Sequence, residues 1–276
     1  MNAKTKLDFI ILGAHRCGTT WLHENLYHHP EIILSKSKKE LHFFDRDENY
    51  SRGIDFYNDY FDIQEINKLY GEVTPSYLSS SLVPERIKFC FPKAKFIVIL
   101  RNPIERLYSH YKINCGNHNI EESFSNYYNR KPIEKEEGLY INHIKNYMKY
   151  FDKNQFLFLL FDDLAINPVG FYKKTLDFLG VNDISYTPKQ LNLKSNSWQT
   201  KKHNLKNNFI YYIIRMLKHH KYFNLSSKIE NLIQNKNKLH DISNEDRIKL
   251  YDYYQNSITD LESFLDIKLN NWKINN

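Results

Sequence analysis

The sequence predicts an α/β fold with an open, mainly parallel β-sheet flanked by helices, a P-loop-like phosphate-binding loop and a helical C-terminal third. Three apolar runs, within "DFIILGA" (8–14), "KFIVILRNP" (95–103) and "FLFLLFDDL" (156–164), are continuous rather than alternating, as in strands that are buried on both faces of a sheet. A helical pattern follows each run, and repeated strand–helix units favour parallel strands.

The first half of the chain supplies two of these strand–helix units. The run "DFIILGA" (8–14) leads into a helix from about Thr19 to Tyr27, where leucines recur at i and i+4. A shorter strand is expected at "EIILS" (31–35). The run "KFIVILRNP" (95–103) leads into a helix over "IERLYSHYKI" (104–113).

The second half is predicted to be mostly helical after one more strand. The run "FLFLLFDDL" (156–164) leads into a helix in which Pro168 suits the first turn and Gly180 the C-terminal cap. Residues 136–151 show a helical pattern. The stretch "SNED" (243–246) resembles a capping box, which predicts that the last long helix begins there.

Composition and cysteine usage limit the class of protein. Of the 276 residues, 41% are hydrophobic and 26% charged, which is typical of a globular protein, and without repeats or linkers we expect a single domain over residues 1–276. No apolar run reaches the ~18–20 residues of a membrane span, and no signal-peptide cleavage site is evident. The three cysteines form no CxxC pair, so we expect neither disulfides nor zinc, and a reducing, cytoplasmic setting.

The stretch "GAHRCGTTWL" (13–22) has the glycine spacing GxxxxG between the first strand and the first helix. Such a loop aims several backbone N–H groups at one point, and the N-terminus of the helix adds a partial positive charge. Thr19 and Thr20 add hydroxyl donors, and Arg16 adds a planar guanidinium that matches phosphate oxygens. Taken alone, the stretch fits either an anion-binding cradle or an ordinary glycine-rich turn.

The loop differs from a Walker loop, because Thr19 stands where that motif has lysine, and no convincing Walker B strand is seen. This favours a ligand with one phosphate at the loop and no metal-bound triphosphate. His23, His28 and His29 match no zinc spacing and are expected to be surface or capping histidines. No metal is predicted. A kinase or NTPase with a variant phosphate loop, and a non-catalytic nucleotide-binding module, are the alternative functions.

Four motifs follow one another at sensible spacing: "GAHRCGTTWL" (13–22), "KKELHFFDRDENYSRGIDFYNDYF" (38–61), "GEVTPSYL" (71–78) and "KFIVILRNPIERLYSHY" (95–111). Together they resemble the sulfotransferases that use 3′-phosphoadenosine 5′-phosphosulfate (PAPS), above all the heparan-sulfate-type carbohydrate enzymes and their bacterial relatives. The resemblance covers residues 8–115 well and continues weakly to the C-terminus. It implies an enzyme of class EC 2.8.2 that sulfates a hydroxyl, less readily an amine, of a carbohydrate, glycolipid or small-molecule acceptor.

The resemblance also implies where PAPS binds. Its 5′-phosphosulfate would lie on the loop residues Arg16, Cys17, Gly18, Thr19 and Thr20. Arg16 takes the place of a lysine in glycosaminoglycan-modifying relatives, and its implied role is to stabilise charge on the leaving 5′-phosphate. Cys17 is expected to be a small loop residue rather than a nucleophile.

A second phosphate clamp is implied by "RNPIERLYS" (101–109). Arg101 and Ser109 match the family residues that hold the 3′-phosphate, which distinguishes PAPS from ordinary nucleotides. Arg106 and Glu105 are expected to form a salt bridge on the helix surface.

The motif "KELHFFD" (39–45) implies the catalytic base. Glu40 matches the glutamate that accepts the acceptor's proton, although outside this context it would read as a surface charge in a lysine-rich run. If the segment is extended, His42 points the same way and positions the acceptor or shares the base role. Asp45 is expected to orient them, and Phe43 and Phe44 to lie in the core.

One departure from the family pattern concerns Val73, where many glycosaminoglycan-type relatives have a lysine near the transferred group. The missing charge is expected from Arg16 or from one of three lysines, Lys36, Lys38 or Lys39. The departure also weakens the case for a highly anionic acceptor.

The net charge of +7 is concentrated in residues 194–221, which hold seven basic and no acidic residues. Three interpretations stay open. The segment packs as a helix with a basic outer face, or it lies on a membrane that presents a lipid-linked acceptor, or Lys201 and Lys202 close over the 3′-phosphate. No nucleic-acid partner is predicted.

Overall fold

The computed structural model describes residues 6–35, 39–61, 67–118, 122–182 and 241–274. Its centre is a five-stranded sheet in the order β2-β3-β1-β4-β5, in which every neighbouring pair is parallel. The strands are β1 (Phe9–Gly13), β2 (Ile32–Leu34), β3 (Leu69–Val73), β4 (Lys95–Leu100) and β5 (Phe156–Leu160). The predicted open α/β fold with a parallel sheet is therefore confirmed.

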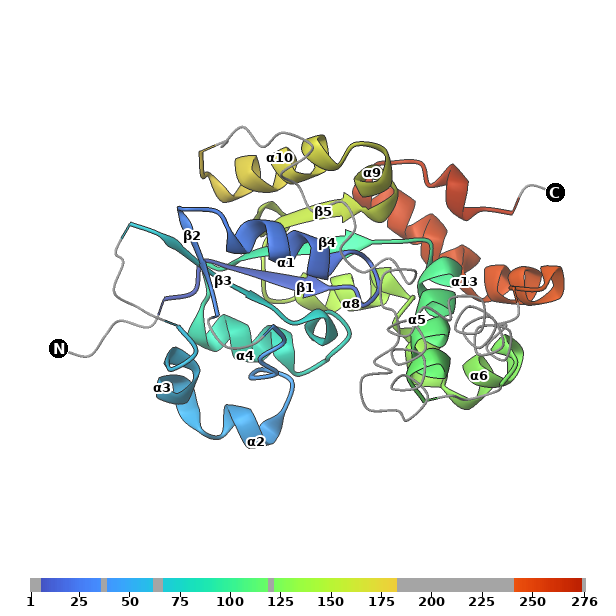
Figure 1. Cartoon of the computed structure of the whole chain (residues 1–276), viewed down its shortest axis with the longest axis horizontal. Helices are drawn as coiled ribbons and strands as arrows, with labels where there is room; N and C mark the ends of the chain where they lie inside the picture. The colour runs from blue at the N-terminus through green and yellow to red at the C-terminus, as the bar shows by residue number, and fades with distance from the viewer. Residues whose placement is uncertain (1–5, 36–38, 62–66, 119–121, 183–240, 275–276) are drawn as a thin grey trace, which may run out of the picture.

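Helices cover both faces of the sheet (Figure 1): α10 lies above it in this view and α4 and α8 below it, while α5, α6 and α13 gather to one side. The helices are α1 (Thr19–Tyr27), α2 (Asp47–Tyr50), α3 (Gly53–Asn58), α4 (Val83–Cys90), α5 (Pro103–His118), α6 (Phe124–Arg130), α7 (Pro132–Glu136), α8 (Tyr140–Tyr147), α9 (Phe161–Ile166), α10 (Pro168–Leu179) and α13 (Asn244–Leu265). Short 3-10 turns are η1 (Pro75–Tyr77), η2 (Lys153–Gln155) and η4 (Asn270–Trp272). The C-terminal helix α13 packs on α8 and α5.

The central strands are buried on both faces, as their continuous apolar sequences predict. Every residue of β1 is buried, and in β4 only Lys95 keeps partial exposure. Each Å² of apolar surface that is buried contributes about 25 cal/mol to the free energy of folding, so these strands contribute strongly to stability. The helix predicted from Thr19 to Tyr27 is confirmed at both ends.

Strand β3 has no counterpart among the predicted strands. Its sequence "LYGEV" holds a glycine and a carboxylate, so it does not read as an apolar run. The glycine has a packing reason: Gly71 pairs with Phe9 of β1, and a Cβ at position 71 would lie 2.1 Å from Cζ of that ring. The Phe9 ring occupies the space that a side chain would need.

Several local predictions for the second half are confirmed, with changed limits. Strand β5 ends at Leu160, and α9 follows at once. Pro168 begins α10, and Gly180 caps it with a φ of 77°. Within the predicted helical window 136–151, α8 is the main helix. Helix α13 begins after Ser243, whose Oγ accepts a hydrogen bond from the backbone N–H of Asp246 at 3.0 Å.

Most of the predicted helical C-terminal third, including the basic segment 194–221, lies outside the described residues. Within the described ranges, no helix combines the length and the apolar character needed to cross a membrane. The single-domain prediction for residues 1–276 stays a prediction.

The Phe9–Gly71 contact predicts that Gly71→Ala destabilises the fold. The new methyl group must displace a buried ring, and overpacking of this kind costs about 1–3 kcal/mol. The urea midpoint should fall accordingly. Gly53→Asn is the control, because no atom lies within 4 Å of a Cβ at position 53 and asparagine tolerates its φ of 80° better than most residues; equal midpoints for the two variants would contradict this account.

Candidate active site

The glycine-rich loop runs from the carboxyl end of β1 into α1. Gly18 precedes the helix with a φ of 90°, and a Cβ there would lie 2.9 Å from the Leu164 side chain. Both the conformation and the close contact therefore favour glycine. Because the first N–H groups of a helix have no acceptor within it, the first turn of α1, with Thr19 and Thr20, presents free donors beside the loop.

Cys17 is a packing residue of the loop. Its side chain is fully buried, and Sγ donates to the carbonyl of His15 at 3.4 Å and lies 3.9 Å from the Tyr140 hydroxyl. Burial raises the pKa of this thiol to about 11, so it is protonated at neutral pH. A protonated, buried thiol supports the small-loop-residue interpretation over the nucleophile.

The structure brings Arg16, Arg101 and Ser109 together from the loop, the end of β4 and α5. Nε of Arg16 donates to Oγ of Ser109 at 3.4 Å, and Nη1 of Arg101 donates to the carbonyl of Arg16 at 3.2 Å. Burial, and next the nearby Arg101, lower the pKa of Arg16. Among the described residues, neither guanidinium has a carboxylate within salt-bridge distance. Guanidinium groups are good hydrogen-bond donors to anions, so two neighbouring ones give this side of the loop a positive charge.

Glu40 and His42 face each other, although the premise that the segment is extended is wrong. Both residues have left-handed backbone conformations, with φ of 68° and 52°. The backbone therefore turns between them, and this turn brings Nε2 of His42 to 4.0 Å from Oε2 of Glu40. The Glu40 side chain is 36% exposed.

Asp45 holds the His42 ring from the other side. Nδ1 of His42 lies 2.9 Å from Oδ2 of Asp45, and Oγ of Ser76 donates to the same oxygen at 2.6 Å. Burial alone would raise the pKa of Asp45, but the hydrogen bonds from His42 and Ser76 outweigh it and lower this pKa. An ionised Asp45 favours the tautomer with the proton on Nδ1, which leaves Nε2 directed at Glu40.

Backbone bonds to β3 fix the segment that carries these groups. The N–H of Glu40 donates to the carbonyl of Val73 at 2.9 Å, and the N–H of Leu41 donates to Oγ1 of Thr74 at 3.1 Å. The Val73 side chain is 3% exposed and belongs to the core. Position 73 therefore contributes its backbone to the site.

A buried carboxylate and a tyrosine complete this support. The Tyr77 hydroxyl accepts from the N–H groups of Phe43 and Phe44 at 2.8 and 3.2 Å. Glu72, 1% exposed, accepts from the Tyr57 hydroxyl at 2.6 Å and from Oγ1 of Thr74 at 2.8 Å. Burial raises the pKa of Glu72, while its hydroxyl donors act in the opposite direction. Phe43 and Phe44 are core residues, as predicted.

Lys39 directly precedes residues 40–44, which we call the base segment, and its ammonium group lies between this segment and the phosphate loop. Its Nζ donates to Oγ1 of Thr20 at 2.7 Å and to Oε1 of Glu40 at 3.1 Å. The sequence offered it only as one of several replacements for the lysine missing at Val73. Two of the others, Lys36 and Lys38, lie outside the described residues.

A family model described as "Sulfotransferase domain" matches residues 6–262. This chain belongs to the sulfotransferase family. The chain is 31% identical over 193 residues to the human bifunctional heparan sulfate N-deacetylase/N-sulfotransferase 3, covering 63% of this chain and 22% of that protein. It is 32% identical over 183 residues to mouse heparan sulfate glucosamine 3-O-sulfotransferase 6, covering 63% and 52%. The chain thus spans about half of these curated relatives or less.

A solved sulfotransferase from Alicyclobacillus acidocaldarius shares the fold, with a TM-score of 0.70 and 23% identity over 97% of this chain and 98% of that one. The predicted resemblance and the enzyme class that it implies are confirmed at the level of the family.

Arg106 of this sulfotransferase is not a surface residue, so that prediction is wrong. Its side chain is fully buried, and Nη1 donates to Oε2 of Glu137 at 3.0 Å. The same carboxylate lies 3.5 Å from Nδ1 of His15, a loop residue. The pair links the loop to the segment between α7 and α8. Glu105 does lie near the surface, where it pairs with Arg247 at 2.8 Å.

The histidines of the first helix and the turn after it differ from one another. His28 is exposed, as expected. His29 is buried, and its Nδ1 accepts from the N–H of Glu31 at 3.2 Å, which caps the turn before β2. His23 is partly buried, and burial together with the charge of Lys39 lowers its pKa to about 4. Within the described part of the sulfotransferase, no group of three or more His, Cys, Asp or Glu residues is arranged to hold a metal ion.

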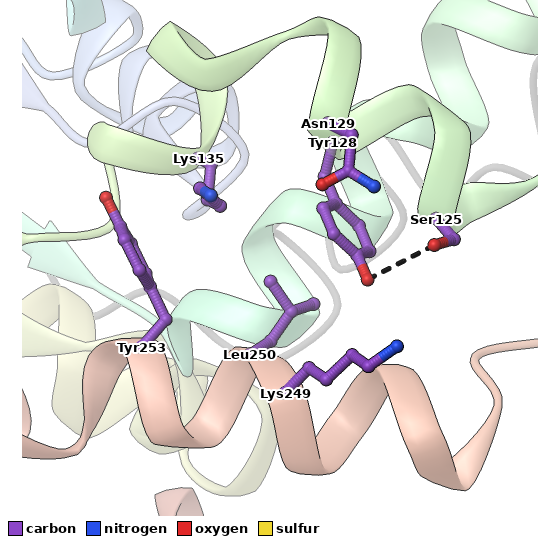
Figure 2. A pocket seen from close by; sticks show the side chains of 7 residues that line it. All are labelled: Ser125, Tyr128, Asn129, Lys135, Lys249, Leu250 and Tyr253. Carbon is purple, nitrogen blue, oxygen red and sulfur yellow. Dashed lines mark hydrogen bonds between the residues drawn. The ribbon is translucent and has the colours of Figure 1, made fainter.

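A pocket of about 280 Å³ lies between α6, α7 and α13, apart from the candidate site residues (Figure 2). Seven residues line it: Ser125, Tyr128, Asn129, Lys135, Lys249, Leu250 and Tyr253. None of them belongs to the phosphate loop, the base segment or the Arg101–Ser109 clamp.

The hydrogen bonds of Tyr77 predict that Tyr77→Phe loosens the base segment. Without the hydroxyl, the buried N–H groups of Phe43 and Phe44 lose their acceptor, which costs about 1–3 kcal/mol. Hydrogen exchange should accelerate in peptides that cover residues 40–44. Tyr254→Phe is the control, because that buried hydroxyl donates to the carbonyl of Lys135 instead. Unchanged exchange in Tyr77→Phe would refute the assigned support.

Proposed function

We propose that this domain transfers a sulfuryl group from PAPS to a hydroxyl, less readily an amine, of a carbohydrate or glycoconjugate acceptor. One observation carries the proposal: the ammonium group of Lys39 donates both to Oγ1 of Thr20 in the phosphate loop, at 2.7 Å, and to Oε1 of Glu40, at 3.1 Å. A carboxylate beside a phosphate cradle is the arrangement that transfer to a hydroxyl needs, because the base and the donor must meet at the acceptor oxygen.

The donor side of the site fits two anionic groups. The loop, with Thr19, Thr20 and Arg16, suits a phosphosulfate, and the pair of Arg101 and Ser109 suits a second phosphate. When bound, PAPS supplies an activated sulfur–oxygen bond whose leaving group is adenosine 3′,5′-bisphosphate. Arg16 would donate hydrogen bonds to the leaving oxygen; it cannot protonate it, because a guanidinium keeps its proton in proteins.

On the acceptor side, Glu40 accepts the proton of the acceptor hydroxyl as the oxygen attacks sulfur. His42, held by Asp45, is directed at the same carboxylate and orients the acceptor. As in phosphoryl transfer, the rate gain comes mainly from positioning and charge stabilisation.

The acceptor class rests on the relatives, whose names describe enzymes of heparan sulfate. The uncharged Val73 argues for an acceptor that is less anionic than a mature glycosaminoglycan, and glycolipids and small molecules belong to the same proposal. Membrane contact through residues 194–221, a role for Lys201 and Lys202, and a cytoplasmic location stay predictions.

The second phosphate clamp predicts a preference among nucleotides. The purified chain should bind adenosine 3′,5′-bisphosphate at least tenfold more tightly than AMP in calorimetry without magnesium. Arg101→Ala should reduce this preference, whereas Arg130→Ala, at an exposed ion pair with Glu122, should not. Equal affinity for the two nucleotides would argue against the clamp, and tight ATP binding that requires magnesium would favour a kinase.

The position of Glu40 predicts that Glu40→Gln abolishes transfer. Loss of a general base lowers the rate by about 10²–10⁴-fold, while binding of adenosine 3′,5′-bisphosphate should stay within about threefold of the wild type, since the loop and the clamp are unchanged. Transfer is measured with labelled PAPS and a panel of unsulfated and partly sulfated heparan-type oligosaccharides. Glu48→Gln, at the exposed start of α2, serves as the control. Full activity of Glu40→Gln would exclude this base.

A further inference from the structure

Two cations lie at the phosphate loop and make different contacts. Arg16, a residue of the loop, donates from its Nε to Oγ of Ser109 in α5 at 3.4 Å. Lys39 approaches from the base segment, where its Nζ meets Glu40 and Thr20. Of these two cations, Lys39 is the one that touches the carboxylate expected to deprotonate the acceptor.

We infer that Lys39 is a further catalytic residue, whose ammonium group binds the sulfuryl group as it passes from donor to acceptor. This inference rests on the proposed function.

The donor count of the ammonium group supports this role. A lysine has three N–H donors, and within the described residues two are used, by Oγ1 of Thr20 and by Oε1 of Glu40. One donor is left at the junction of the phosphate loop and the base. A sulfuryl oxygen is an acceptor of the right charge for it, and charge-assisted bonds of this kind are the strong ones.

The ammonium group of Lys39 is partly shielded from water. The Lys39 side chain is 20% exposed, so water solvates it only in part. The nearby His23 has its pKa lowered to about 4 and carries no charge at neutral pH, so it does not compete for the anion. Burial lowers the pKa of Lys39, and Arg16 acts in the same direction against the raising effect of Glu40.

In the step, the bond between sulfur and the 5′-phosphate oxygen breaks while the acceptor oxygen bonds to sulfur. The acceptor's proton goes to Glu40, the leaving 5′-phosphate keeps the electron pair, and Lys39 keeps its proton throughout. The ammonium group thus spreads the charge of the three sulfuryl oxygens and holds them in line between the two oxygens. The same position also explains how the site can function with the uncharged Val73.

The test compares two ligands that differ by the sulfuryl group alone, PAPS and adenosine 3′,5′-bisphosphate, in calorimetry on the full chain. Lys39→Met should raise the Kd of PAPS at least tenfold and leave that of the bisphosphate within threefold. Lys39→Arg should restore most of the PAPS affinity, because it returns a charged donor. Lys145→Met, which removes an exposed ion pair with Asp260, should change neither Kd.

A double variant removes the remaining ambiguity, since an unpaired Glu40 could itself repel PAPS. In a Glu40→Gln background, the PAPS-specific loss caused by Lys39→Met should persist. Equal weakening of both ligands, no weakening of either, or a loss that vanishes in the Glu40→Gln background would overturn the inference alone. A wild-type chain that binds neither ligand would overturn the proposed function as well.

Discussion

The candidate site depends on the hydrogen bonds that tie residues 40–44 to the end of β3. Glu40 and Leu41 are held by Val73 and Thr74, and the next amides by the Tyr77 hydroxyl. Two non-glycine residues in left-handed conformations need such support, because that region is sterically unfavourable for side chains with a Cβ. The cost of the turn is offset by bonds made in the core.

The buried Glu72 supports these hydrogen bonds from the core. Burial of an isolated carboxylate costs free energy, and the hydroxyl groups that donate to Glu72, including those of Tyr57 and Thr74, offset this cost. Thr74 uses one hydroxyl to donate to Glu72 and to accept from the base segment. A disturbance of the core carboxylate would therefore reach the amide of Leu41, next to Glu40, through Thr74.

The other half of the site follows from parallel topology. Strands β1, β3 and β4 end at the same edge of the sheet, and from these ends come the phosphate loop, the support for the base and Arg101. Open parallel sheets place ligand sites at this edge. The cations at the loop make different contacts: Arg16 bonds to Ser109 of α5, Arg101 to the carbonyl of Arg16, and Lys39 to Thr20 and Glu40.

Local sequence patterns were enough to predict the apolar strands of the sheet, the glycine-rich loop, the first helix and the helix caps. These features are local: burial on both faces requires continuous apolar runs, and a cap requires a particular residue at one position. The resemblance added the residues of the candidate site, including Glu40, Arg101 and Ser109. Strand β3 escaped prediction because its glycine makes room for a ring from another strand.

The pairing of charged groups could not be predicted from local patterns, because it depends on contacts between distant segments. Arg106 reads as a surface residue in its helix, yet it is buried against Glu137, because the partner comes from a segment 31 residues away. His42 meets Glu40 through a turn that no alternation pattern encodes. The sequence did not distinguish Lys39 from its neighbouring lysines, whereas the structure places its ammonium group between Thr20 and Glu40. Local patterns encode burial and conformation, whereas the pairing of charges depends on which distant segments the fold brings together.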